Sequence, residues 1–223
     1  MRELVHALKG ALDYTRIYRG QTFVLKLGGE ILANPEALDN VAMQVALLDS
    51  LSIRVVLVHG GGPQASELSR RMGLEPEMVA GRRVTSPEVL EIAKMVFAGQ
   101  LNTDVLAALR RHGVRGVGLS GVDARLITAK KRAPVTMRDD TGELRTVDFG
   151  EVGDIESFDT TLLELLVERH HVPVVASLAS DDEGRVLNVN ADTVAETLAA
   201  ALGAKKLIFL SASPGILRDV KDP

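Results

Sequence analysis

The chain contains no cysteine and no tryptophan, and aromatic residues make up only 3% of its 223 residues. Without cysteine the protein forms no disulfide and uses no thiolate chemistry, which fits a reducing compartment. No run of 18 apolar residues predicts a transmembrane helix, and the charged start "MRELVHALKGALDY" lacks the apolar block of a signal peptide. These absences predict a soluble, cytoplasmic protein with a core of Val, Leu, Ile and Ala.

The charge balance excludes two broad classes of partner. The net charge is -4, with 25% charged and 46% hydrophobic residues, an ordinary globular composition. A general binder of nucleic acid or of membrane surfaces needs a basic surface instead. We therefore expect neither nucleic acid nor a membrane among the partners.

Apolar runs of strand length alternate with longer helical patterns. Several runs are apolar at nearly every position, as is typical of strands buried on both faces. The runs cover 22–28, 53–60, 114–121, 172–178 and 206–212, and the helical patterns 34–52, 86–113, 159–171 and 190–204. This alternation predicts an α/β fold with a mainly parallel sheet and helices on both faces.

Two segments add detail to this outline. The pattern at 86–113 starts with a Ser cap followed by Pro and Glu, and it closes on Gly113. Residues 125–153 break the alternation and predict short antiparallel strands with "DDTG" (139–142) as a turn.

Glycines at strand ends mark the candidate site, because ligands of parallel sheets bind beyond the carboxyl ends of the strands. "VLVHGGGPQ" places Gly60, Gly61 and Gly62 between a strand and a helix. Their backbone N–H groups and the helix N-terminus suit an anion. A tight turn that needs glycine for positive φ is an equally good interpretation of the triplet alone.

"FVLKLGGEIL" places Lys26 at the end of the first strand, just before Gly28 and Gly29. A lysine there supplies a mobile positive charge for a phosphate, and the glycines leave room for a ligand against the backbone. A lone strand-end lysine more often extends its ammonium group into solvent.

Polar residues before two helices are further candidates. Arg82 or Arg83 in "GRRVTSPE" suits a bidentate grip on a carboxylate, or forms a solvated surface pair. In "NVNADTVAETL", Asn188 offers both a donor and an acceptor to a ligand, whereas Asn190 or Asp192 alone is best explained as a helix cap.

Two other polar clusters favour structural interpretations. His170 and His171 end a helix, where they complement its dipole, and no third ligand lies nearby in sequence for a metal site. "AKKR" (129–132) is interpreted as a solvated charge cluster on a hairpin. We expect no protein metal site.

Taken in order, five stretches resemble the amino-acid kinase family, in particular its members that phosphorylate N-acetylglutamate. They are "TFVLKLGGE", "VVLVHGGGPQ", "AGRRVTSPEVLEIAKMVFAGQLN", "GVGLSGVDARLI" and "VLNVNADTVAETLAAALGAKKLIFLSASPGIL". The resemblance implies a three-layer α/β/α sandwich over 21–223. It also implies transfer of the γ-phosphoryl group of ATP, accompanied by Mg²⁺, to the γ-carboxylate of N-acetyl-L-glutamate in arginine biosynthesis.

The resemblance implies roles at the nucleotide end of the site. Lys26 would stabilise charge on the transferring phosphoryl group, and Asp192 would organise the catalytic lysines. Gly28 and Gly29 would let the nucleotide phosphates approach the backbone.

The resemblance also implies roles for the acceptor substrate. Gly61 and Gly62 would meet its reacting carboxylate and the transferring group through backbone N–H. Arg83 would hold the α-carboxylate, and Asn188 would lie near the acetamido group.

Departures from the family pattern leave alternatives open. Ala212 stands where an acidic residue is common, and the chain ends at Pro223 before a "GGMxxK" segment that completes the family's nucleotide site. We therefore expect a piece of a longer protein. The second hypothesis for the function is the arginine-binding, kinase-like domain of an N-acetylglutamate synthase. The third hypothesis is a kinase for a related acylated amino acid such as an aminoadipate derivative.

The first 20 residues resemble the extra helix of arginine-inhibited members, where it joins dimers into hexamers. The resemblance implies a homo-oligomer with L-arginine as a feedback inhibitor. A plain amphipathic surface helix is the alternative, although its exposed Leu, Ala and Tyr would then lack a partner.

Overall fold

The structure, a computed structural model, describes residues 14–75, 77–79, 82–138 and 143–211, without the side chains of Arg82 and Arg83. Among these residues no helix is long and apolar enough to cross a membrane. Residues 14–18 are helical, and Tyr18 packs edge-on against Phe23 with the Lys206 ammonium over its ring. The rest of the predicted N-terminal helix lies outside the described residues.

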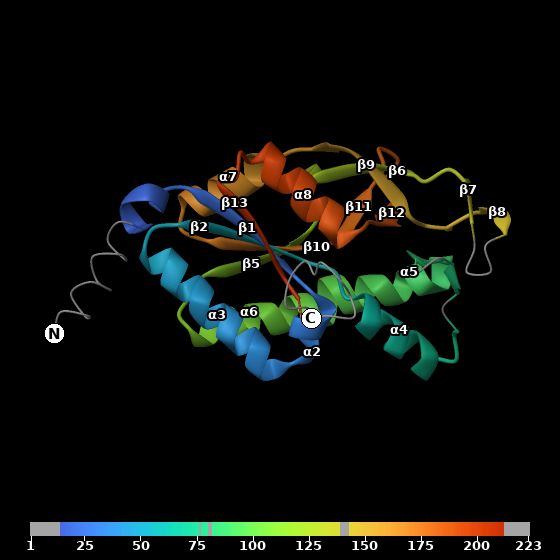
Figure 1. Ribbon diagram of the computed structural model, residues 1–223, viewed down its shortest axis with the longest axis horizontal. Coiled ribbons are helices and arrows are strands. Elements are labelled where there is room, and N and C mark those ends of the chain that lie inside the picture. Colours follow the sequence, from blue (N-terminus) through green and yellow to red (C-terminus); the bar gives the residue numbers. More distant parts are fainter. Residues whose placement is uncertain (1–13, 76, 80–81, 139–142, 212–223) are drawn as a thin grey trace.

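A sheet of five parallel strands forms the middle layer (Figure 1). Its strands, in the spatial order β13-β1-β2-β10-β5, are β13 (Lys206–Leu210), β1 (Thr22–Leu27), β2 (Arg54–His59), β10 (Val172–Ala176) and β5 (Gly116–Ser120). Each coincides with one of the five apolar runs, so all five predicted strands are confirmed. The inner strands β2 and β10 are almost wholly buried, which explains their unbroken apolar sequences.

Helices cover both faces of this sheet, which confirms the three-layer α/β/α fold (Figure 1). Alternate residues of β1 enter different cores: Phe23 and Leu25 pack on one face, and Val24 packs on the other. The first core is shared with α2 (Gly29–Ala33), α3 (Pro35–Ser50), α4 (Gly62–Arg71), α5 (Pro87–Lys94) and α6 (Asn102–Arg111). The second is shared with α7 (Thr161–Glu168) and α8 (Ala191–Ala201).

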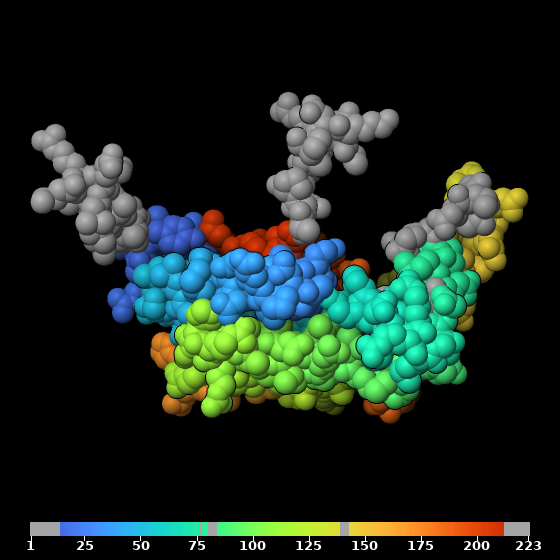
Figure 2. Space-filling model, turned by 90° about the horizontal axis from the view of Figure 1, so that it is seen from below, coloured from blue at the N-terminus to red at the C-terminus, as the bar shows by residue number. Residues whose placement is uncertain are grey.

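The helical pattern at 86–113 forms a continuous helical stretch with a π-helical turn inside it. Ser86 accepts a hydrogen bond from the Val89 N–H, as predicted for its cap, and Gly113 ends the stretch at φ 76°. Between α5 and α6 lies the π-helical turn η1 (Met95–Leu101), which the sequence pattern did not predict. Figure 2 shows α3 and α6 across the outer face of this layer.

A second, four-stranded sheet lies beside the α8 layer. It has the order β12-β11-β6-β9, formed by β12 (Val186–Asn188), β11 (Leu178–Ser180), β6 (Ile127–Lys131) and β9 (Gly153–Phe158). Two hairpins pair β3 (Met78–Val79) with β4 (Arg82–Arg83) and β7 (Val135–Arg138) with β8 (Leu144–Val147). The antiparallel strands expected within 125–153 are thus confirmed, while the predicted "DDTG" turn lies outside the described residues.

Close packing between β5 and α6 predicts a large difference between two glycine substitutions. A Cβ on Gly118 would lie 2.0 Å from Asn102 Oδ1, whereas one on the exposed Gly99 meets nothing within 4 Å. Gly118→Ala should lower the free energy of unfolding by about 1–3 kcal/mol because the core must shift. Gly99→Ala should be neutral or stabilising by less than about 1 kcal/mol. Urea unfolding of both variants tests this, and equal effects would contradict the described packing.

Candidate functional site

One pocket of about 600 Å³ opens beyond the carboxyl ends of β1, β2 and β10. Its lining combines strand ends, the start of α8, the end of β12 and the turn formed by Gly60, Gly61 and Gly62, called the glycine turn below. Six of the residues predicted for the site line it together: Lys26, Gly29, Gly61, Gly62, Asn188 and, from the start of α8, Asp192. The sheet therefore gathers residues that are up to 166 positions apart, from 26 to 192, at one edge.

The glycine turn lies between β2 and α4. Gly61 has φ 154°, a conformation that favours glycine, and a Cβ there would lie 2.3 Å from Leu101 Cδ1. α4 begins directly afterwards at Gly62, so its N-terminus faces the same side as the turn. The interpretation as a turn that requires glycine is thus confirmed for Gly61, and all three glycines line the pocket, where anion binding by the turn stays a prediction.

The glycines after β1 have different surroundings. Gly29 begins α2 and lines the pocket, and its carbonyl accepts a hydrogen bond of 2.7 Å from Gln64 Nε2. Gly28 is not among the residues that line the pocket. Its N–H donates to the Leu210 carbonyl at 2.8 Å, and a Cβ there would lie 2.9 Å from the same oxygen. Gly28 thus packs against the edge strand β13.

Lys26 and Asp192 form an ion pair at the mouth of the pocket, with Nζ 2.7 Å from Oδ1. The side-chain alternation of β1 puts Lys26 on the face of Val24, which α8 covers. The Asn190 side chain caps α8, since its Oδ1 accepts from the N–H groups of Asp192 and Thr193 at 2.8 and 3.0 Å. Because Asn190 is the cap, the Asp192 carboxylate is available to the lysine.

Asn188, the last residue of β12, is held from several sides. Its Nδ2 donates to Thr85 Oγ1 at 3.2 Å, and its backbone N–H donates to the Glu151 carbonyl at 2.9 Å. Thr85 itself is fully buried between Phe149 and Glu151, with which it shares backbone hydrogen bonds. The bond to Thr85 uses one of the two amide N–H donors, so Asn188 can still present a donor and its acceptor oxygen to a ligand.

Arg83 is placed only through its backbone. It pairs with Met78 in the β3–β4 hairpin, and Met78 lines the pocket. The Arg83 side chain lies outside the described residues, so its grip on a carboxylate stays a prediction.

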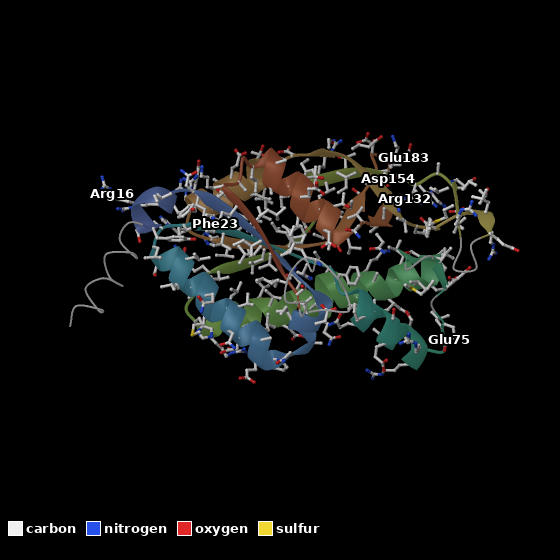
Figure 3. The ribbon with its side chains drawn as sticks, in the orientation of Figure 1. Arg16, Phe23, Glu75, Arg132, Asp154 and Glu183 are labelled. Carbon is white, nitrogen blue, oxygen red and sulfur yellow. The ribbon has the colours of Figure 1, made fainter. Side chains whose placement is uncertain are left out.

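Arg132 is a pocket residue that the sequence analysis placed wrongly. The guanidinium donates through Nε and Nη2 to Asp154 Oδ1 at 2.9 and 2.6 Å (Figure 3). Its side chain is only 22% exposed and it lines the pocket, so the solvated interpretation of "AKKR" is wrong for this residue. Little in the sequence indicates this pair, because Asp154 lies 22 positions away on another strand.

The buried carboxylate of Glu151 stabilises the segment that carries Asn188 into the pocket lining. Glu151 is 8% exposed and accepts two hydrogen bonds from Arg185, at 2.8 and 2.9 Å, with Lys131 Nζ at 3.4 Å. Its backbone carbonyl is the group that holds the Asn188 N–H. A bidentate pair of this kind fixes geometry as well as charge, so it stabilises the position of β12 at the pocket.

Beneath the glycine turn lies a histidine that the sequence analysis did not single out. His59 is fully buried, and burial lowers its pKa to about 4, so the ring is neutral at neutral pH. Its Nδ1 is 2.9 Å from the Gly60 carbonyl oxygen, and its Nε2 is 3.1 Å from Asn102 Nδ2. The His170–His171 pair lies elsewhere, at the end of α7.

A further feature of the site is the metal-binding capacity of the residues that the structure describes. No group of three His, Asp or Glu side chains in that part of the chain could hold a metal ion. The pocket lining thus offers two cations, Lys26 and Arg132, each paired to a carboxylate, together with backbone N–H groups. Such a lining suits an anionic ligand.

Comparison with known proteins gives matches along nearly the whole chain. The sequence profile of the Amino acid kinase family matches residues 21–223. The chain is 51% identical to the acetylglutamate kinase of Myxococcus xanthus over 218 residues, which are 97% of this chain and 71% of that protein. It is 43% identical to the acetylglutamate kinase of Methanothermobacter thermautotrophicus over 220 residues, covering 98% and 75% respectively.

Solved structures show the same architecture. N-acetylglutamate synthase from Neisseria gonorrhoeae, complexed with coenzyme A and N-acetyl-glutamate, matches with a TM-score of 0.79 at 28% identity. The match covers 96% of this chain and 47% of the synthase, so the chain spans about half that protein's length. The same synthase complexed with coenzyme A and L-arginine matches with a TM-score of 0.77 at 25% identity, over 96% of this chain and 49% of the synthase.

The buried His59 predicts a loss of stability in mild acid. The pKa in the folded protein, about 4, is below the ordinary value of 6.5, so between these pH values the unfolded chain binds the extra proton. The free energy of unfolding should fall as the pH drops through this window, by about 2 kcal/mol at pH 5. Chemical unfolding between pH 4.5 and 7.5 measures it, with His59→Gln as the control that lacks this proton. Identical pH slopes in both proteins would contradict the prediction.

Proposed function

Because the chain belongs to the amino acid kinase family, we propose that it catalyses the ATP-dependent phosphorylation of the γ-carboxylate of N-acetyl-L-glutamate, a step of arginine biosynthesis. Acetylglutamate kinases that share 43–51% of its residues over nearly its whole length support this activity. The structural observation that supports it best is the Lys26–Asp192 ion pair, held over the pocket beside the glycine turn.

The chemistry of the reaction explains why such a pocket suits it. Phosphoryl transfer to a carboxylate joins two anions, so catalysis depends on alignment and on positive charge more than on covalent steps. In this proposal the Lys26 ammonium group neutralises the charge of the transferring group. Asp192 would hold that ammonium group in place through the ion pair of 2.7 Å.

The other side of the pocket suits the acceptor substrate. The N–H groups of the glycine turn would bind the oxygens of the reacting carboxylate and of the phosphoryl group. Asn188 would lie near the acetamido group, with its side chain held by the bond from Nδ2 to Thr85 Oγ1. Arg83, on the hairpin at the rim, would hold the α-carboxylate.

ATP would enter with Mg²⁺. In phosphate-transferring sites this ion keeps most of its ligands from water and nucleotide phosphates and takes one or two protein carboxylates. The Asp192 carboxylate of the pocket lining is already paired to Lys26, so the ion would be held by the nucleotide phosphates and water. The ion would neutralise charge on the β- and γ-phosphates.

We propose a second role, feedback regulation by L-arginine, on one specific observation. The fold matches an N-acetylglutamate synthase that was solved both with N-acetyl-glutamate and with L-arginine. In this proposal residues 1–20 join subunits into a homo-oligomer that arginine stabilises, and residues 21–223 form the kinase domain. A chain that bound arginine without any kinase turnover would instead match the regulatory, kinase-like domain of a synthase.

Substitution of Lys26 tests the phosphoryl-transfer role. In the full-length protein, Lys26→Met should lower kcat at least about 100-fold, because a preorganised charge at the transition state is lost. ADP release with ATP, Mg²⁺ and N-acetylglutamate is the measurement, with unacetylated glutamate as a substrate control. The matched control is Lys130→Met, a lysine 68% exposed and paired to Glu156, which should keep kcat within twofold. Equal turnover in both variants would refute the assignment.

Arginine binding separates regulation from catalysis. Isothermal titration of the full-length protein with L-arginine should show saturable binding, and sedimentation should show a shift to a larger species. Deletion of residues 1–20 should remove the shift while turnover remains. No heat of binding and no change in sedimentation would exclude arginine as a regulator.

A further inference from the structure

Beneath the glycine turn lie two buried polar side chains that the mechanism above does not use. His59, at the end of β2, is fully buried, and Asn102, the first residue of α6, is 4% exposed. The registers of β2 place His59 beside Leu27 of β1 and Ala176 of β10, so its strand neighbours are uncharged. Buried polar groups of this kind need defined partners, because an unpaired one costs free energy.

The orientation of the Asn102 amide follows from its neighbours. Its Nδ2 lies 3.0 Å from the Val174 carbonyl oxygen and 3.4 Å from the Leu119 carbonyl oxygen. Both are acceptors, so the nitrogen and not the oxygen of the amide must face them. The same Nδ2 is 3.1 Å from His59 Nε2 and therefore donates its second hydrogen to the ring.

The tautomer of His59 follows in turn. A ring nitrogen that accepts a hydrogen bond carries no proton, so Nε2 is the unprotonated nitrogen of a neutral ring. The proton is then on Nδ1, which lies 2.9 Å from the Gly60 carbonyl oxygen and donates to it. The low pKa of His59 is consistent with a ring that stays neutral at physiological pH.

The Gly60 carbonyl sets the direction of the next N–H. The C=O of Gly60 and the N–H of Gly61 belong to one planar trans peptide, in which they point in opposite directions. Since the carbonyl points down to His59, the Gly61 N–H points away from the buried ring, on the side where Gly60, Gly61 and Gly62 line the pocket. No described residue accepts a hydrogen bond from this N–H.

The surroundings leave this arrangement little freedom. Gly118 on β5 makes room for the Asn102 carbonyl oxygen, which would be 2.0 Å from any Cβ there. Phe97 and Leu101 of the π-helical turn η1 close on the Cα of Gly61. The π-helical turn thus supplies both the wall of the glycine turn and, one residue later, the Asn102 amide.

We propose that Asn102 is a positioning residue for phosphoryl transfer: it selects the Nδ1–H tautomer of His59, which holds the Gly60 carbonyl and so directs the Gly61 N–H at the reacting oxygens. Asn102 and His59 touch no substrate and act only through this peptide. The proposal rests on the phosphotransferase function above, but its structural half, the tautomer, is measurable without any turnover.

Nitrogen-15 NMR of the histidines in the full-length protein tests the tautomer directly. His59 is assigned by comparison with His59→Gln, and the spectrum should show a protonated Nδ1 and an unprotonated, hydrogen-bonded Nε2. In Asn102→Leu, which offers the ring no donor, this preference should disappear. A wild-type ring with the proton on Nε2 would overturn the proposal whether or not the protein is a kinase.

Kinetics of Asn102→Leu test the consequence. The kcat should fall about 10–100-fold, because a donor aimed at the transition state is misplaced, while the KM values for both substrates stay within about threefold. The control is Ser69→Ala, which removes a buried hydrogen bond of 2.8 Å to the Ala65 carbonyl in α4 and should lower stability without changing kcat. An unchanged kcat in Asn102→Leu, or an equal fall in Ser69→Ala, would overturn the positioning role.

Discussion

The site depends on the ion pair between Lys26 and Asp192. This pair depends on the alternation of β1, which sends Lys26 to the face that α8 covers, and on Asn190, which caps α8 and leaves the Asp192 carboxylate to the lysine. A lysine side chain that is only 19% exposed at a strand end is unfavourable without such a partner. The carboxylate offsets this cost and holds the charge at the pocket.

Charged and neutral polar groups occupy different levels of the site. At the pocket, Lys26 and Arg132 are paired to carboxylates, and Glu151 braces the rim through Arg185. Beneath it, the His59–Asn102 pair is uncharged and sealed inside the first core. This division suits the proposed reaction between two anions: the outer charges would attract and align the substrates, and the buried hydrogen bonds would fix the backbone of the glycine turn.

Local features of the sequence predicted most of the scaffold. Unbroken apolar runs identified the strands, since strands buried on both faces have no polar side, and the Ser86 cap identified the start of α5. The glycine triplet and Lys26 marked the pocket because parallel strands bring their carboxyl ends to one edge. The role assigned to Arg83 stays a prediction, because its side chain lies outside the described residues.

Contacts between residues that lie far apart in the sequence could not be predicted from local patterns. Asn188 bonds to Thr85 across 103 positions, and the Arg132–Asp154 pair forms only when β6 and β9 align. Local spacing made "AKKR" look like an ordinary solvated cluster, and helical periodicity does not distinguish a π-helical turn from the α-helix around it. In the sequence His59 is an ordinary residue of an apolar strand. Only the structure shows that its two ring nitrogens bond to Asn102 of a helix and to Gly60 of the glycine turn.

In the proposed reaction, the pocket transfers a phosphoryl group from ATP to the γ-carboxylate of N-acetylglutamate. Phosphorus-31 NMR of the full-length protein with ATP, Mg²⁺ and N-acetylglutamate measures the product itself. An acyl phosphate resonance should grow together with ADP, require both substrates and disappear on addition of hydroxylamine. Conversion of ATP to ADP and inorganic phosphate at the same rate with and without N-acetylglutamate, and no acyl phosphate, would contradict the proposed reaction.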